Sequence, residues 1–126
     1  NEDEALKNSI RVYQESPADA VKIEGGKDKA SLVKKLTDNG IAVCGHIGLL
    51  PQSVRADGGY IVRGKTPLDI EALIEDAEAI EDAGAFCLVV EGIKAEAAAL
   101  ISQVVKIPVI GIGAGSGVDG QVLVFI

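Results

Sequence analysis

Short apolar segments alternate with longer segments of helical periodicity along the whole chain, and this alternation constrains the fold more than any other feature. Apolar runs at 20–24, 41–46, 85–91 and 107–113 predict β-strands, and a further apolar run occupies 121–126. Because these runs are apolar on both faces, they predict a parallel sheet with helices on both sides. Right-handed connections then bring the carboxyl ends of all strands to one edge.

Helical spacing of apolar residues recurs before and between these runs. The predicted helices are residues 3–15, residues 27–39, the segment between Thr66 and Gly84, and residues 94–105. Gly40 is expected to end the second helix and Gly84 the third. Thr66 is expected to cap the third helix, with Pro67 in its first turn and Asp69 completing a capping box.

Two architectures fit this pattern: an open, doubly wound sheet, or part of a (β/α)8 barrel. Five strands cannot close a barrel, and a complete barrel needs about 250 residues. The sequence has 126 residues. Periodicity alone therefore favours the open sheet.

The charge balance excludes several classes of partner. The chain has 19 acidic and 12 basic residues, a net charge of −7 and no basic tract. Nucleic acid and anionic membranes are therefore not expected as partners. No apolar run approaches the roughly 20 residues of a membrane-spanning helix.

Two further observations concern the cysteines and the chain ends. Cys44 and Cys87 lie in separate apolar runs without a C-x-x-C spacing, so we expect reduced core residues, as in an intracellular protein. The sequence contains no methionine, and its last six residues stop within an apolar run. We therefore expect a piece of a longer chain, for which a missing targeting segment indicates no compartment.

Ionisable side chains occur at the predicted carboxyl ends of three successive strands. Lys22 and Glu24 share one face of the first strand, His46 ends the second, and Glu91 ends the third. Parallel topology gathers these residues at one edge, where α/β proteins hold their active sites. The long segment 47–66, rich in Gly, Pro and Asp, is predicted to be a functional loop.

Each of these residues also has a purely structural interpretation. His46 can be a hydrogen-bonded structural histidine, Glu91 can be the anion at the start of the next helix, and Lys22 can form a salt bridge with Glu24. The coincidence of such residues on three successive strands favours a functional site.

Residues 111–117, GIGAGSG, contain the glycine spacing of a dinucleotide-binding loop. That motif should open a helix and be followed by an acidic residue about 20 positions later. Only nine residues follow Gly117, and they have the pattern of a strand. We therefore expect a loop that lines an active site or binds a phosphate or carboxylate through backbone N–H groups.

Five motifs, in order along the chain, resemble the ketopantoate hydroxymethyltransferase family. They are VKIEGG (21–26), VCGHIGLLPQSV (43–54), GGYIVRGK (58–65), LVVEG (88–92) and IPVIGIGAGSGVDGQVLV (107–124). The resemblance implies a (β/α)8 TIM barrel of the group that includes phosphoenolpyruvate mutase and isocitrate lyase. Residues 1–126 would form one partial barrel domain, about strands four to eight, lacking the first three strands and the C-terminal end.

The same resemblance implies an activity. Family members transfer a hydroxymethyl group from methylenetetrahydrofolate to 3-methyl-2-oxobutanoate in pantothenate biosynthesis, using Mg²⁺. Lys22 and His46 would then bind the substrate, Glu24 would lie at the metal, directly or through water, and Glu91 would accept the proton. Members form homo-oligomers, and the expected location is cytoplasmic for a bacterial member and mitochondrial for a fungal one.

Part of the family's site has no counterpart in this sequence. Two metal-binding aspartates and a substrate-contacting serine belong to the first three strands. Glu24 alone is a poor Mg²⁺ site, because magnesium prefers six near-octahedral oxygen ligands. Two alternatives therefore stay open: a catalytically incomplete fragment that binds or assembles with other subunits, and another keto-acid C–C lyase or mutase of the same barrel group.

Overall fold

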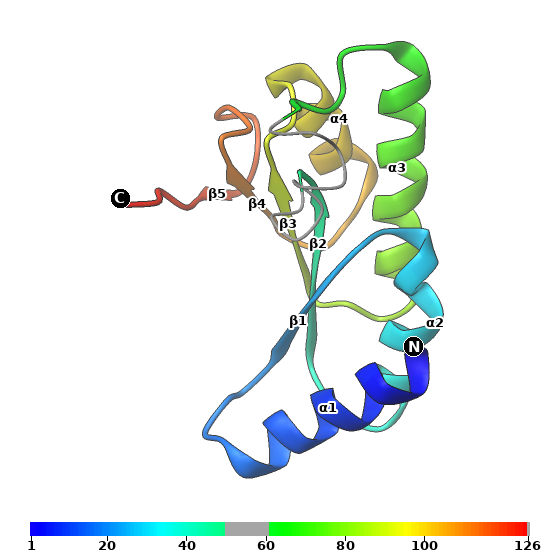
Figure 1. The fold of residues 1–126 in the computed structure, drawn as a ribbon. Coiled ribbons are helices and arrows are strands. Elements are labelled where there is room, and N and C mark those ends of the chain that lie inside the picture. The colour runs from blue at the N-terminus through cyan, green and yellow to red at the C-terminus, as the bar shows by residue number, and fades with distance from the viewer. Residues whose placement is uncertain (50–60, 126) are drawn as a thin grey trace.

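A computed structural model describes residues 1–49 and 61–125. The elements are α1 (Glu2–Glu15), β1 (Val21–Glu24), the 3-10 turn η1 (Lys27–Lys29), α2 (Ala30–Asp38), β2 (Val43–Gly48), α3 (Pro67–Asp82), β3 (Cys87–Glu91), α4 (Ala95–Val104), β4 (Val109–Ile112) and β5 (Gly120–Gln121). The strands form one parallel sheet in the order β1-β2-β3-β4-β5 (Figure 1). None of the helices in the described ranges is long and apolar enough to cross a membrane.

The strand order decides between the two predicted architectures. Each strand pairs with the strand before it in the chain, and the order never reverses. A doubly wound sheet reverses its order at a switch point, whereas a (β/α)8 barrel adds every new strand beside the last. The fold is therefore that of an incomplete (β/α)8 barrel, and the preference for an open sheet was wrong.

The hydrophobic core lies between one face of the sheet and the helices. The strand residues of this face are fully buried, and they are Val43, Ile47, Leu88, Val90 and Val109. The helices supply Leu32, Val33, Leu36, Leu73, Ala77, Ile80, Ala97 and Ile101 to the same core.

The opposite face of the sheet is not covered by helices within the described residues. Its side chains Cys44, Val89, Ile110 and Ile112 are only half-buried. The prediction of helices on both sides was therefore wrong here. Right-handed crossovers without a reversal of strand order place α2, α3 and α4 on the same side.

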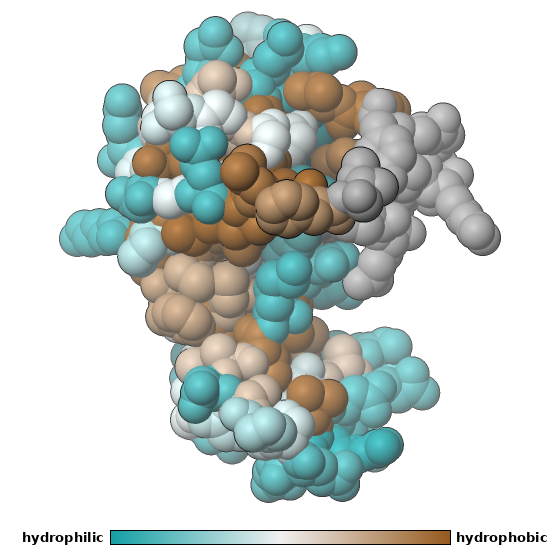
Figure 2. Space-filling view, turned by 90° about the vertical axis from the view of Figure 1, so that its left-hand side faces the viewer, coloured by the Kyte–Doolittle hydropathy of each residue, from teal (hydrophilic) through white to brown (hydrophobic). Residues whose placement is uncertain are grey.

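The C-terminal apolar run differs from its prediction. Only Gly120 and Gln121 pair with β4, although the Val122 N–H still donates to the Gly111 carbonyl at 2.9 Å. Val122–Phe125 then leave the sheet, and their side chains are exposed. Apolar side chains accordingly gather on the side of the molecule that this segment reaches (Figure 2).

Two carboxylates bind backbone groups around the start of β4. Glu81 accepts hydrogen bonds from the N–H groups of Lys106 and Ile107, at 2.5 and 3.0 Å. Asp119 Oδ2 accepts from the Val109 N–H at 2.8 Å, while the Asp119 N–H donates to the Val109 carbonyl at 2.9 Å. These bonds fix the amino-terminal edge of the sheet.

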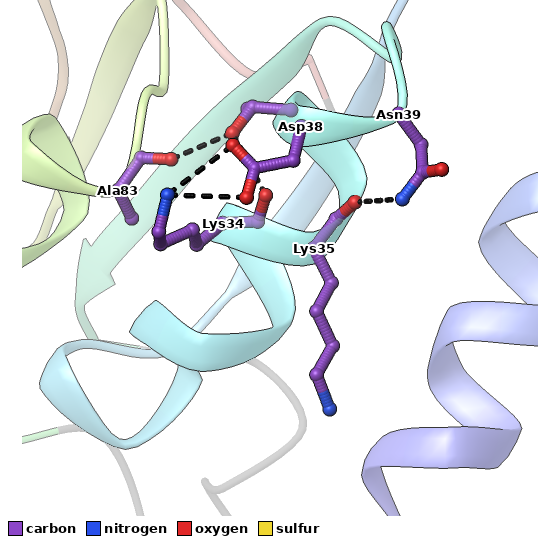
Figure 3. A network of polar contacts seen from close by, with 6 residues as sticks. Lys34, Lys35, Asp38, Asn39 and Ala83 are labelled. Carbon is purple, nitrogen blue, oxygen red and sulfur yellow. Dashed lines mark hydrogen bonds and ion pairs between the residues drawn. The ribbon is translucent and has the colours of Figure 1, made fainter.

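A polar network joins the end of α2 to the end of α3. The Thr37 hydroxyl donates to the Ala83 carbonyl at 2.7 Å, and Lys34 pairs with Asp38 in the same network (Figure 3). The next residue, Gly84, has a φ of +105°, and a Cβ there would lie 2.7 Å from the Thr37 hydroxyl oxygen. The helix end predicted at Gly84 is therefore confirmed, and Thr37 holds it against α2.

Thr37→Val should lower the free energy of unfolding by about 1–2 kcal/mol, because it leaves the part-buried Ala83 carbonyl without this donor. Urea denaturation measures the change, and Thr37→Ser, which keeps a hydroxyl, is the matched control. Equal stability of the Val variant and the parent protein would show that the bond contributes nothing.

Candidate active site

The four ionisable residues singled out from the sequence lie on the uncovered face of the sheet. Glu24 on β1 is the direct register partner of His46 on β2, and Lys22 pairs with Cys44 two residues earlier. Glu91 pairs with Gly48 and so lies two positions beyond His46. The predicted gathering at one edge is confirmed. The end of β2 was misplaced, because the strand continues past His46 to Gly48.

His46 lies between two carboxylates. Its Nε2 is 3.2 Å from Glu91 Oε1, and its Nδ1 is 3.7 Å from Glu24 Oε1. The His46 side chain is 2% exposed, whereas both glutamates are 20% exposed. The imidazole is therefore the buried centre of the group, and each carboxylate keeps access to the outside.

Burial sets the protonation state of His46. Loss of hydration, followed by the positive charge of Lys22, lowers the pKa of this imidazole, and the two carboxylates oppose the shift only in part. The ring is therefore neutral near pH 7 and carries one proton. Nε2 lies within hydrogen-bond distance of Glu91 Oε1 at 3.2 Å, whereas Nδ1 is 3.7 Å from Glu24 Oε1, so we place the proton on Nε2, where it donates to Glu91.

Two buried polar atoms of this group lack a hydrogen-bond partner in the described part of the chain. His46 Nδ1 and Glu24 Oε2 make no hydrogen bond to any of the described residues. Both atoms accept hydrogen bonds in this state, and an unsatisfied buried polar atom costs about 1–3 kcal/mol. These two acceptor atoms are therefore suited to a ligand that donates hydrogen bonds or carries positive charge.

Lys22 is exposed and lies on the same face as Glu24. No ion pair joins the two side chains in the parts of the chain that the structure describes, where the ionisable neighbour of Glu24 is His46, at 3.7 Å. The salt-bridge interpretation of this pair is therefore not supported. The ammonium group remains available to a negatively charged ligand.

The glycines after Glu24 make room for a residue from α3. A Cβ on Gly26 would lie 2.1 Å from Cγ of Asp76, and Gly25 has a φ of +129°. Asp76 Oδ1 accepts from the Lys27 N–H at 2.9 Å. Asp76 therefore fixes the turn that follows Glu24. No sequence pattern indicates this role, because Asp76 is one of seven acidic residues in α3.

A second anchor lies beside Glu91. Arg63 pairs with Asp69 at 2.6 Å, and its backbone N–H donates to the Gly92 carbonyl at 2.9 Å. The Arg63 guanidinium also lowers the pKa of Asp69. Thr66 caps α3 as predicted, but Asp69 binds Arg63 and the Gly64 N–H. The Asp69 carboxylate thus binds the Arg63 guanidinium in place of the Thr66 N–H, which it would bind in a capping box.

The sequence also predicted a functional loop at residues 47–66. Of the segment 47–66 that we expected to be functional, residues 50–60 lie outside the described part of the chain. In the described end of this segment, the Arg63 backbone is tied to the connection that follows Glu91, because its N–H donates to the Gly92 carbonyl and its carbonyl accepts from the Lys94 N–H, both at 2.9 Å.

The glycine loop packs against α4. A Cβ on Gly115 would lie 2.5 Å from the Ala95 Cβ, and one on Gly117 would lie 2.9 Å from the Ala99 Cβ. The strand β5 follows the loop, where a dinucleotide motif would open a helix. The close contact between this loop and α4 explains why residues 115 and 117 are glycines. Binding of an anion by the loop stays a prediction.

Comparison with known proteins decides the family. The model of the family described as ketopantoate hydroxymethyltransferase matches residues 1–126. The chain belongs to this family. It is 67% identical over 125 residues to the 3-methyl-2-oxobutanoate hydroxymethyltransferase of Sulfurimonas denitrificans and 62% identical to that of Aliarcobacter butzleri.

The coverage of these matches is unequal. Each alignment includes 99% of this chain but only 48% and 46% of the two relatives, so the chain spans about half the length of the curated relatives it matches. Among solved structures, dihydrodipicolinate synthase from Agrobacterium tumefaciens superimposes with a TM-score of 0.59 at 14% identity, over 94% of this chain and 41% of the other. That likeness supports the barrel fold.

Gly26→Ala should destabilise the protein by about 1–3 kcal/mol, because the new methyl group overlaps the Asp76 carboxylate. Gly26→Ala combined with Asp76→Ala should recover part of that loss by making room. Urea denaturation of both single variants and the double variant gives the coupling energy. Strictly additive losses would show that the two positions do not interact.

The folding free energy should depend on pH through His46. Because the pKa of His46 is lowered in the folded state, the unfolded chain takes up this proton first as the pH falls, and stability is lost below about pH 6.5. His46→Gln should remove this part of the pH dependence, measured by urea denaturation between about pH 7.5 and 5.5. Parallel pH profiles for the parent and the variant would contradict the assignment.

Proposed function

We propose that the protein containing this chain transfers a hydroxymethyl group from methylenetetrahydrofolate to 3-methyl-2-oxobutanoate, and that Glu91 is the base that takes the C3 proton. The membership of the family supports the reaction. The observation that carries the assignment of the base is the 3.2 Å contact between Glu91 Oε1 and the buried His46 Nε2. This contact holds a partly exposed carboxylate at the end of β3.

His46 acts on the base by positioning it. Its Nε2–H donates to one oxygen of Glu91, so the other oxygen is the one that can approach the substrate. The imidazole itself is held inside the sheet by the pairing of β2 with β1 and β3. A fixed base of this kind contributes roughly 10²–10⁴-fold to the rate of proton transfer.

Lys22 supplies the positive charge of the proposed site. Removal of the C3 proton leaves an electron pair that delocalises onto the keto oxygen of the substrate. An ammonium group on the same face of the sheet stabilises that developing negative charge. The nucleophilic C3 then forms a C–C bond with the one-carbon unit, the bonds from that carbon to the folate nitrogens break, and one water supplies the hydroxyl oxygen of the product.

Glu24 is the described residue that fits the proposed Mg²⁺. Its buried Oε2 has no hydrogen-bond partner in the described residues, as expected for an oxygen that binds a cation or one of its waters. The described residues contain no cluster of three or more His, Cys, Asp or Glu able to hold a metal, so further ligands must come from elsewhere. When bound, Mg²⁺ would act as a Lewis acid on the keto acid.

Exchange of the C3 proton of 3-methyl-2-oxobutanoate for deuterium tests the base without requiring folate. The assay uses the natural protein that contains residues 1–126. In this protein, Glu91→Gln should slow the exchange by at least about 100-fold. Glu96→Gln is the matched control, because Glu96 is an exposed carboxylate in the first turn of α4.

Two outcomes would contradict the proposal. Exchange that persists in the Glu91→Gln variant would remove Glu91 as the base. A parent protein that neither exchanges this proton nor transfers the hydroxymethyl group would point to another keto-acid lyase or mutase of the barrel group, or to a fragment that only assembles with other subunits.

A further inference from the structure

The two cysteines, which are 43 positions apart in the chain, face each other across β2 and β3. Cys44 and Cys87 are direct register partners on the uncovered face of the sheet. Both thiols are free and half-buried, and their sulfur atoms are 3.0 Å apart. The sequence showed two isolated core cysteines, so the pairing is a property of the fold alone.

The backbone geometry suits a covalent bond between these sulfurs. Neighbouring strands lie about 4.8 Å apart, which is within the range of about 4.4–6.8 Å between the Cα atoms of a disulfide. Because directly paired residues project to the same face, the two Cβ atoms also point the same way. Bond formation therefore needs only a small rotation of the two side chains.

We propose that Cys44 and Cys87 form a redox-responsive dithiol, which a small hydroperoxide closes to a disulfide within the sheet. This site is separate from the residues that carry the proposed transfer reaction. It lies next to them, because Cys44 precedes His46 by two residues on β2 and Cys87 precedes Glu91 by four residues on β3.

The structure indicates which sulfur reacts first. Burial and the neighbouring Cys87 thiol raise the pKa of Cys44 to about 12, so Cys44 is a poor first nucleophile. Its thiol also donates to the Gly45 carbonyl at 3.4 Å. Cys87 is therefore the thiol that meets the oxidant, and Cys44 is the resolving thiol.

The two steps balance with hydrogen peroxide as the oxidant. The Cys87 sulfur attacks one peroxide oxygen, an S–O bond forms, the O–O bond breaks, and the departing hydroxide takes the Cys87 proton as water. The Cys44 sulfur then attacks the Cys87 sulfenic acid, the S–S bond forms, and the hydroxyl leaves with the Cys44 proton as a second water. Dithiothreitol returns two electrons and two protons and restores both thiols.

Peptide mapping of the intact protein tests the proposal independently of its catalytic activity. After treatment with hydrogen peroxide and blocking of the remaining thiols, trypsin should release residues 36–55 linked to residues 66–94. The linked pair should weigh about 2 Da less than the two reduced peptides together. Dithiothreitol should separate them.

Two variants serve as controls. Cys87→Ser should abolish the link and leave Cys44 unoxidised. Cys44→Ser should abolish the link and leave a sulfenic acid on Cys87 that dimedone can trap. The proposal is overturned if the native parent protein gives sulfinic acid on Cys87 without a link. It is also overturned if both thiols stay reduced at peroxide concentrations that link them in the urea-unfolded protein.

Discussion

The position of His46 depends on the backbone pairing of β2 with its two neighbours. Glu24 and Val89 are its partners on either side, and the Gly25 N–H adds a hydrogen bond to the His46 carbonyl at 2.9 Å. A slip of one residue would turn His46 toward the helices and the apolar core. Packing blocks that slip, because a Cβ in place of Gly45 would lie 2.5 Å from Cγ2 of Ile80. The sheet, rather than the side-chain contacts of the site, thus holds the imidazole in place.

The two faces of this sheet perform different tasks. One face is filled with aliphatic side chains against α2, α3 and α4, and supplies the stability of the fold. The other face carries ionisable and sulfur-containing side chains at alternate positions of the same strands. A short strand such as Val43–Gly48 therefore contributes both to the core, through Ile47, and to the candidate site, through His46.

Local patterns in the sequence predicted the elements and the gathering of Lys22, Glu24, His46 and Glu91. They could not predict which face of the sheet the helices cover, because apolar strands suit an open sheet and a barrel equally. They also missed Asp76, which acts across 49 positions on the turn after Glu24. The Cys44–Cys87 contact and the replacement of a capping box by Arg63 and Asp69 likewise depend on tertiary neighbours that no local pattern encodes.

The carboxylates at the two edges of the sheet differ in what they bind. Glu81 and Asp119, around the start of β4, accept from backbone N–H groups, whereas Glu24, at the end of β1, keeps a buried oxygen that no described residue donates to. For enzyme engineering, this difference divides the molecule into two zones. Substitutions at Glu81 or Asp119 would change thermal tolerance and leave the chemistry alone. Substitution of Glu24 itself would act on the proposed site and leave those backbone hydrogen bonds in place.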